Sequence, residues 1–446
     1  MSHALAPLPR RAAALVPVLP LVAVPVLLAL PLTGDGAGPA DVVSGLVVGY
    51  CVIRVLRERR RPLSPAAALV LGLPVVGIAL AALGASSPQA GLAGMGRYLQ
   101  IFVLVPAAVL ILLRDRAGFR VLAWSFVGLA LWQGAVGVHQ YATGTGASYQ
   151  GEGIRAVGTF GAGDVMGMAT VVSLGLVCAA GIALGRAPVR QRLAAAVCAA
   201  VLLLPLALSF SRGAWIATAL TCAAQLAMAG LRRALKVAAA VAAAGVILMG
   251  GFGVGTAALQ ERIDSIAQVT DAPDQSVVDR YTLWASATGM WREHPLTGVG
   301  LKNFPEYRDA HATVALSSGS DIEGAGAEYH KQALLSPHSM YLLVLSEQGL
   351  IGLVTLVGSW LALLVCGARR LLLVRRRGPG LDCGLVACGL LVWLLTDFVY
   401  GDIGGPSTVL TAMALGLAAW WALACGEPEA RPRDAAGERV GEAVAR

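Results

Sequence analysis

Three polar residues in this chain of 446 residues have the side chains and positions expected of a site for an anionic ligand. Arg212 interrupts two apolar runs in the segment SFSRGAW, and Arg280 opens a segment with helical spacing. His338 follows Pro337 at the start of a further apolar run. A guanidinium group binds phosphate oxygens through paired hydrogen bonds, and an imidazole can remove a proton from a hydroxyl near neutral pH. These residue types predict an anion site with a general base.

Each of these residues also has a structural interpretation. Arg212 could extend to lipid headgroups, but its turn is too short to need a charge for topology, so a functional role is favoured. A histidine at a helix start could bond to a backbone carbonyl, yet the cations upstream of His338 favour a site. For Arg280 the two interpretations are balanced. The aromatic residues after it are more typical of an interfacial belt than of a sugar-stacking platform.

The polar stretch 259–336 is where such a site would face a non-cytoplasmic ligand. It contains eleven acidic and six Lys or Arg residues, so its cations need a specific partner or ligand. A helix is expected up to Pro295, and Gly298 and Gly300 are expected to form a tight turn in which the backbone approaches a ligand. The cations and imidazoles of this stretch include Arg280, Arg292, His294, Lys302, Arg308, His311, His330 and Lys331.

Several carboxylates could orient His338. Glu347 lies nine residues later, which at about 100° per residue places it on the opposite helix face and roughly 14 Å deeper, so we expect it to be a buried polar group instead. Asp397 and Asp402, near the outer end of the next run, are better placed by topology. Candidate supporting residues of the site are Tyr341, Asp397 and Lys302.

No metal or other cofactor is predicted. The spacings of His294, His311, His330 and His338 do not place two ligands on one helical face, and no HExxH or paired-aspartate motif accompanies them. The eight cysteines lie in or beside apolar runs, so they are interpreted as packing residues and not as a disulfide framework.

The composition excludes a soluble protein, since 57% hydrophobic and 13% charged residues cannot cover a soluble surface. We predict an all-α fold, a polytopic transmembrane helical bundle of about 12 spans, because one crossing needs about 20 apolar residues. One large extracytoplasmic loop would contain an amphipathic helix. The apolar runs lie near residues 12–31, 40–56, 66–84, 95–113, 119–138, 164–185, 192–209, 213–230, 235–258, 338–366, 381–400 and 406–425.

Basic residues occupy every second connection between these runs, from Arg10 and Arg11 to the arginines of the tail. Because cytoplasmic turns are enriched in Lys and Arg, both termini are predicted to be cytoplasmic in a multi-pass protein of the cytoplasmic membrane. This pattern accounts for the net charge of +8, so no nucleic-acid partner is expected. The predicted divisions are residues 1–258, the bundle with nine spans; 259–336, the extracytoplasmic loop; 337–425, the last three spans; and 426–446, a cytoplasmic tail.

Four segments in this order resemble the O-antigen ligase and polymerase family of bacterial membrane glycosyltransferases. They are GTFGAGDVMGMA at 158–169, SFSRGAW at 209–215, DRYTLW to GVGLKNF within 277–304, and PHSMYLLVLSEQGLIGL at 337–353. The resemblance implies a helical bundle with one large periplasmic loop and a metal-independent transfer of a glycan from an undecaprenyl-diphosphate carrier to a hydroxyl. By position, Arg212 and Arg280 match the family's arginines and His338 its histidine. Ser339 and Asp164 depart from the family, which often has Asn at both places.

The resemblance therefore implies an enzyme in which Arg212 and Arg280 bind the diphosphate and His338 is the general base. Its partners would be a polyprenyl-diphosphate-linked glycan donor, an acceptor that is a glycan, lipid, protein or wall polymer, and the membrane lipids. A transporter of lipid-linked glycans or other amphipathic anions would instead need ionisable residues deep in the spans, and only Glu347 and Asp397 qualify. If the protein were a non-catalytic partner in polysaccharide assembly, substitutions in its loop would disrupt complex formation without abolishing a transfer reaction.

Overall fold

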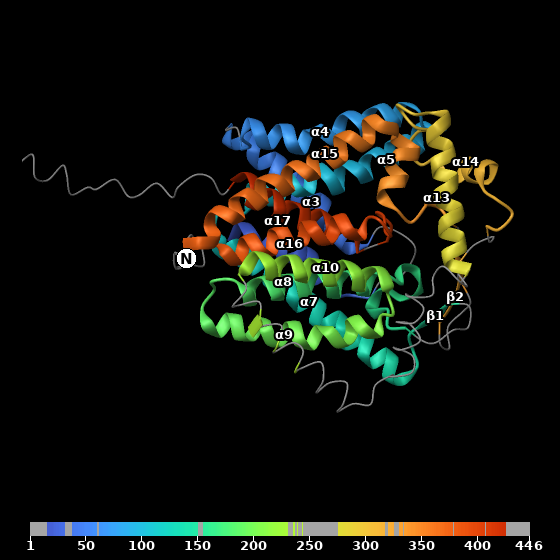
Figure 1. Cartoon of the computed structure of the whole chain (residues 1–446). Coiled ribbons are helices and arrows are strands. Elements are labelled where there is room, and N and C mark those ends of the chain that lie inside the picture. The colour runs from blue at the N-terminus through green and yellow to red at the C-terminus, as the bar shows by residue number, and fades with distance from the viewer. Residues whose placement is uncertain are drawn as a thin grey trace, which may run out of the picture.

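The computed structural model describes residues 16–31, 38–59, 62–149, 155–230, 235–236, 239, 243, 275–316, 320–324, 330–332, 334–377, 379–405 and 407–424. Within these ranges most of the chain is helical, and the long helices run side by side while one helix of the polar stretch crosses their ends (Figure 1). The predicted all-α, membrane-type architecture is therefore confirmed. The predicted run at 235–258 lies almost entirely outside the described residues.

The bundle consists of helices that coincide with the predicted apolar runs. They are η1 (Val16–Val18), α2 (Leu19–Leu27), α3 (Pro39–Glu58), α4 (Pro65–Leu83), α5 (Pro88–Leu99) with η2 (Gln100–Leu104) and α6 (Val105–Leu112), α7 (Arg116–Thr143), η3 (Gly158–Asp164), α8 (Gly167–Leu184), α9 (Val189–Leu208), α10 (Arg212–Ala229), α15 (Met340–Arg377), α16 (Leu381–Asp397), α17 (Thr408–Ala419) and η4 (Trp420–Ala424).

Seven helices among the described residues are long and apolar enough to cross a membrane. They are α3, α4, the continuous helix α5–η2–α6, α7, α8, α9 and α15. Helices α10, α16 and α17 coincide with three more predicted runs and pack in the same bundle. The count of about 12 spans stays a prediction.

Local sequence signals explain where several of these helices begin and end. Ser64, Ser87 and Asp115 cap α4, α5 and α7 by accepting a hydrogen bond from the N–H three residues further on, at 3.2, 3.1 and 2.8 Å. A proline directly follows Ser64 and Ser87. Proline lacks an N–H, and the first helical position has no intrahelical partner for one. Gly144 ends α7 in the left-handed conformation with φ 70°.

Helix α8 forms the centre of the bundle, because nearly all of its residues are buried and it packs against α7, α9, α10 and α16. Small residues allow this close packing. A Cβ added at Gly175 would lie 2.2 Å from the Ala130 Cβ on α7, and one at Gly181 would lie 2.7 Å from the Val386 side chain on α16. The core therefore depends on glycine at these crossings.

The polar stretch folds against one end of this bundle. Helix α13 (Gln275–Glu293) crosses the helix ends and packs on α15 and on the short α14 (Phe304–His311), as Figure 1 shows. A small antiparallel sheet in the order β1-β2-β3 joins β1 (Ala147–Tyr149), which precedes η3, to β2 (Ser320–Gly324) and β3 (His330–Gln332). Strands of three to five residues are too short to leave an alternating pattern, so the sequence did not predict them.

The expected turn at Gly298 and Gly300 is present, with φ 67° and 101°, but it approaches protein backbone. A Cβ at Gly298 would meet the backbone of Glu347 at 2.4 Å, and one at Gly300 would meet the Gly84 carbonyl oxygen at 2.1 Å. Val299 N–H donates to the Ser346 carbonyl at 2.9 Å. The close approach predicted for a ligand is thus used to attach the polar stretch to α4 and α15.

Glu347 is buried, as predicted, and is bonded to the first residue of the short helix α14. It accepts a hydrogen bond from Phe304 N–H at 3.3 Å, at the start of α14. Two residues later α15 departs from helical geometry at Gly349, with φ 65° and ψ −164°, where a Cβ would meet Leu296 backbone at 2.3 Å. The first turns of α15 are therefore shaped by the loop that precedes α14.

Candidate active site at one end of the bundle

His338 lies in a short segment that three hydrogen bonds attach to its surroundings. Met340 N–H donates to the carbonyls of Phe398 at 2.9 Å and Gly401 at 2.8 Å, beyond the end of α16. On the other side, the Trp284 Nε1–H of α13 donates to the Pro337 carbonyl at 2.9 Å. His338 itself has φ 49°, an uncommon conformation for a residue other than glycine. The histidine is thus held between α13, α15 and α16.

Arg280 reaches the same place from α13. It lies one turn before Trp284, and its neighbour Asp279 is buried. The Arg280 guanidinium interacts electrostatically with both His338 and Asp397, the last residue of α16. Two of the residues selected from the sequence, 58 positions apart, therefore lie within electrostatic reach of each other.

Arg212 begins α10, whose first turn is capped by Ser211 through an acceptor contact from Ala214 N–H at 3.4 Å. A Cβ added at Gly213 would lie 3.5 Å from the Tyr400 Cβ. The ring of Tyr400 in turn lies 6.2 Å from that of Trp284, between centroids. The partly buried Arg212 therefore begins its helix beside the corner at which α13 meets the His338 segment.

The electrostatic surroundings keep the His338 imidazole neutral at neutral pH. Burial lowers its pKa below the ordinary value, the Asp402 carboxylate opposes this, the Arg280 guanidinium adds to it, and Asp279 opposes it more weakly. The net direction is downward. A neutral imidazole retains the lone pair that a general base requires.

Among the carboxylates around His338, Asp402 has the largest effect on the pKa of the imidazole. The sequence had placed Asp402 near His338 only by topology. Its Oδ2 accepts a hydrogen bond from the Ser336 hydroxyl, and the same Ser336 oxygen accepts one from His338 N–H at 3.4 Å. Ser336 and Asp279 were not selected from the sequence. Asp279 could have been noticed as the acidic neighbour of Arg280, whereas no local pattern marks Ser336.

The three candidate supporting residues occupy different surroundings. Asp397 lies beside Gly401, whose added Cβ would be 3.0 Å from the Asp397 Oδ2, and it is in electrostatic reach of Arg280. Tyr341 donates its hydroxyl to the Leu395 carbonyl at 2.7 Å, which ties α15 to α16. Lys302 is exposed, has φ 65°, and lies near α5, where a Cβ on Gly94 would be 3.2 Å from its Cγ.

Among the residues that the structure describes, no group of three or more His, Cys, Asp or Glu side chains is arranged to hold a metal ion. At this corner the Arg280 guanidinium lies within electrostatic reach of a neutral imidazole, and Arg212 begins the neighbouring helix α10. Such a site can accept a proton from a hydroxyl and stabilise negative charge on a leaving group.

The fold and this site define a multi-pass helical membrane protein with a polar site of arginine, aspartate and histidine side chains at one end of its bundle. Residues 194–357 match the family model described as O-antigen ligase. The match includes Arg212, Arg280 and His338 and confirms the resemblance noted from the sequence motifs. It indicates glycan transfer of the O-antigen ligase or polymerase kind. A search of curated proteins found no match.

Proposed function

We propose that this protein transfers a glycan from a polyprenyl-diphosphate carrier to an acceptor hydroxyl on the outer face of the cytoplasmic membrane. Arg212 and Arg280 bind the diphosphate, and His338 is the general base. Both termini then lie in the cytoplasm, and the stretch 259–336 forms the large extracytoplasmic loop.

In this reaction His338 removes the proton from the acceptor hydroxyl, and the oxygen forms a bond to the anomeric carbon of the donor sugar. The bond between that carbon and the phosphate oxygen breaks, and its electron pair leaves with the polyprenyl diphosphate. Arg212 and Arg280 neutralise the charge that develops on this leaving group. Asp397 and Tyr341 support the geometry around His338, and the exposed Lys302 adds positive potential for an anionic donor.

The observation that carries this proposal is that α13, which bears Arg280, is hydrogen-bonded to the His338 segment through Trp284 and Pro337, so that Arg280 lies within electrostatic reach of the partly buried imidazole. The Arg280 guanidinium disfavours protonation of the His338 ring, and it also interacts with Asp397. This arrangement suits a base that must stay neutral next to a site for a diphosphate. The start of α10 beside Tyr400 brings a second arginine to the same corner.

The proposal is tested with purified protein, a labelled polyprenyl-diphosphate-linked glycan and a panel of lipid, glycan, protein and wall-polymer acceptors. We expect His338→Ala to lower kcat about 100-fold or more, the typical contribution of a general base. Arg280→Ala and Arg212→Ala should each lower kcat/KM by roughly 100-fold, as for loss of a group that stabilises transition-state charge.

Matched controls are available in the same part of the chain. His294→Ala and Arg292→Ala remove exposed side chains of the same types at the far end of α13, and both should retain activity. Full activity in all three site variants would end the proposal. Movement of the labelled lipid-linked glycan across a vesicle membrane without any transfer product would favour the transporter, and loss of a protein complex alone would favour an assembly partner.

A further inference from the structure

The residues that connect α16 to α17, Phe398 to Ser407, form a glycine-rich segment that we call the α16–α17 connection. It carries Asp402, and it includes Gly401, Gly404 and Gly405. Glycine lets a chain adopt many conformations, so a segment of this composition needs external contacts to hold one side chain in place. Contacts with three other parts of the described structure hold the connection: the His338 segment, η3 and α5.

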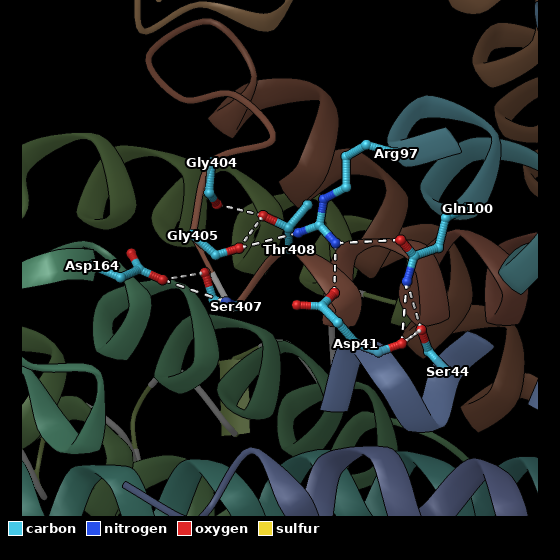
Figure 2. A network of polar contacts seen from close by, with 9 residues as sticks. All are labelled: Asp41, Ser44, Arg97, Gln100, Asp164, Gly404, Gly405, Ser407 and Thr408. Carbon is cyan, nitrogen blue, oxygen red and sulfur yellow. Dashed lines mark hydrogen bonds and ion pairs between the residues drawn. The ribbon is translucent and has the colours of Figure 1, made fainter. Parts of the chain in front are cut away.

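The first contact is the hydrogen bonding of the connection to the His338 segment. The Gly401 carbonyl accepts from Met340 N–H at 2.8 Å, and the Asp402 carboxylate accepts from the Ser336 hydroxyl. The second contact involves η3. There the Asp164 Oδ2 accepts from the Ser407 hydroxyl at 2.9 Å, and a Cβ on Gly405 would lie 2.5 Å from the same oxygen (Figure 2).

The third contact comes from α3 and α5, far from the predicted site in sequence. Arg97 of α5 donates Nη1–H to the Asp41 Oδ1 at 2.5 Å and Nη2–H to the Gly405 carbonyl at 3.3 Å, as Figure 2 shows. Gln100 accepts from Arg97 at 3.4 Å and donates to the Ser44 hydroxyl at 2.8 Å. A fixed guanidinium fork therefore joins the first turn of α3 to the α16–α17 connection.

This ion pair is partly withdrawn from solvent, with side-chain exposures of 24% for Arg97 and 11% for Asp41. A pair of this kind is less screened than a surface pair, and it has several neutral hydrogen bonds around it. Besides Gln100, the Arg97 guanidinium has the Asp41 carboxylate and the Gly405 carbonyl as partners, on two separate elements. That geometry transmits the position of α3 to the backbone of the connection.

We propose that Arg97 is a positioning residue for the reaction proposed above, holding the α16–α17 connection so that Asp402 stays beside His338. This inference rests on the proposed function. Arg97 acts through Asp402 and touches neither donor nor acceptor. The other groups that face His338 are Asp279 and Arg280 of α13, and Arg97 has no described bond to them.

Loss of Arg97 would free the glycine-rich connection and weaken the influence of Asp402 on the imidazole. Because the Asp402 carboxylate raises the pKa of His338, its departure lets that pKa fall further. The acid limb of the pH profile of kcat should then move to lower pH. The base also becomes weaker and less well oriented, so kcat should fall.

The experiment measures transfer by Arg97→Ala, Asp41→Asn, Asp402→Asn and the double variant Arg97→Ala/Asp402→Asn. We expect Arg97→Ala to lower kcat roughly ten- to hundredfold, as for a small misplacement of a catalytic group, with the KM for the donor unchanged. Asp41→Asn should act in the same direction. All four should shift the acid limb to lower pH, and the double variant should be no slower than Asp402→Asn alone, because both changes act through one contact.

Two further variants separate positioning from general stability. Arg97→Lys keeps the charge beside Asp41 and should recover part of the activity and the normal acid limb. Arg54→Ala removes another ion pair of α3, the 2.8 Å contact with Glu58 near the opposite end of that helix, and should behave like the unaltered protein. Thermal unfolding in detergent reports whether each variant is folded.

Two results would overturn the inference. A rise in donor KM with unchanged kcat would make Arg97 a donor ligand, and a loss of thermal stability with an unmoved acid limb would make it a structural residue only. Neither result affects the proposed function. That function fails separately, if His338→Ala, Arg212→Ala and Arg280→Ala all remain fully active.

Discussion

At the scale of single residues, His338 combines an uncommon backbone conformation with a neutral ring. A left-handed φ of 49° in a residue other than glycine costs on the order of 1 kcal/mol or more, and it persists only where the surroundings impose it. Here Trp284 bonds to the preceding carbonyl, and Met340 bonds to the connection after α16. Burial at this position also lowers the pKa of the imidazole.

The pH dependence of transfer follows from the charges around this ring. A general base works in its neutral form, so kcat/KM should fall as the pH drops through the depressed pKa of His338, below its ordinary value of 6.5. Arg280 lowers that pKa, so Arg280→Gln should raise it and move the acid limb of the profile to higher pH, besides reducing the rate.

The control for this shift is Arg292→Gln on the same helix, which should leave the limb in place. The measurement is kcat/KM over a series of buffers of constant ionic strength, because charge interactions depend on salt. An Arg280→Gln limb at unchanged or lower pH would contradict the assigned electrostatic contact with His338.

At the scale of helices, a close crossing of α4 and α15 helps to determine how the end of the bundle next to α13 is assembled. Gly77 and Gly352 meet so closely that a Cβ on Gly77 would lie 2.5 Å from the Gly352 Cα. The absence of a side chain at Gly77 and Gly352 permits this close helix approach. Gly349 has a different function, because its positive φ lets the loop at Leu296 lie against α15.

The α4–α15 crossing gives a stability prediction. Gly77→Ala should destabilise the protein by about 1–3 kcal/mol, the usual cost of adding a methyl group to a filled interior, despite the better helix propensity of alanine. Gly72→Ala is the matched control on the same helix, because no atom lies within 4 Å of its added Cβ. Thermal or denaturant unfolding in detergent compares the two, and an equal stability of both variants would argue against the close crossing.

At the scale of the whole molecule, the basic turns and the candidate site occupy opposite ends of the bundle. Arg186, between α8 and α9, donates hydrogen bonds to the Arg375 and Arg376 carbonyls at 2.9 and 2.8 Å. A Cβ on Gly380 would lie 3.2 Å from the Arg116 side chain, so a third basic turn meets them. The site, α13 and the small sheet lie at the other end (Figure 1). This separation agrees with the alternation expected from the positive-inside rule.

Cysteine labelling tests the orientation. Val314 is fully exposed after α14, and Arg114 is exposed between α6 and α7. In a background without the native cysteines, Val314→Cys should react with a membrane-impermeant maleimide in intact cells, and Arg114→Cys should react only after permeabilisation. The opposite pattern would invert the proposed topology and place the His338 site in the cytoplasm.

The sequence alone determined the class of protein and the positions of most described helices, because both follow from local properties. Run length, composition and capping residues such as Ser64 and Asp115 act within a few residues of themselves. The motifs around Arg212, Arg280 and His338 were equally local. They were sufficient to indicate the family whose model matches residues 194–357.

Only the tertiary structure decided which groups surround those motifs. Ser336, Asp402 and Trp284 meet near His338 because α13 crosses the helix ends and the α16–α17 connection folds back onto the start of α15. The bridge from Arg97 to Gly405 joins residues 308 positions apart. Such contacts depend on how whole helices pack, and the apolar pattern that places a helix in the membrane carries no information about which polar residues its ends will meet.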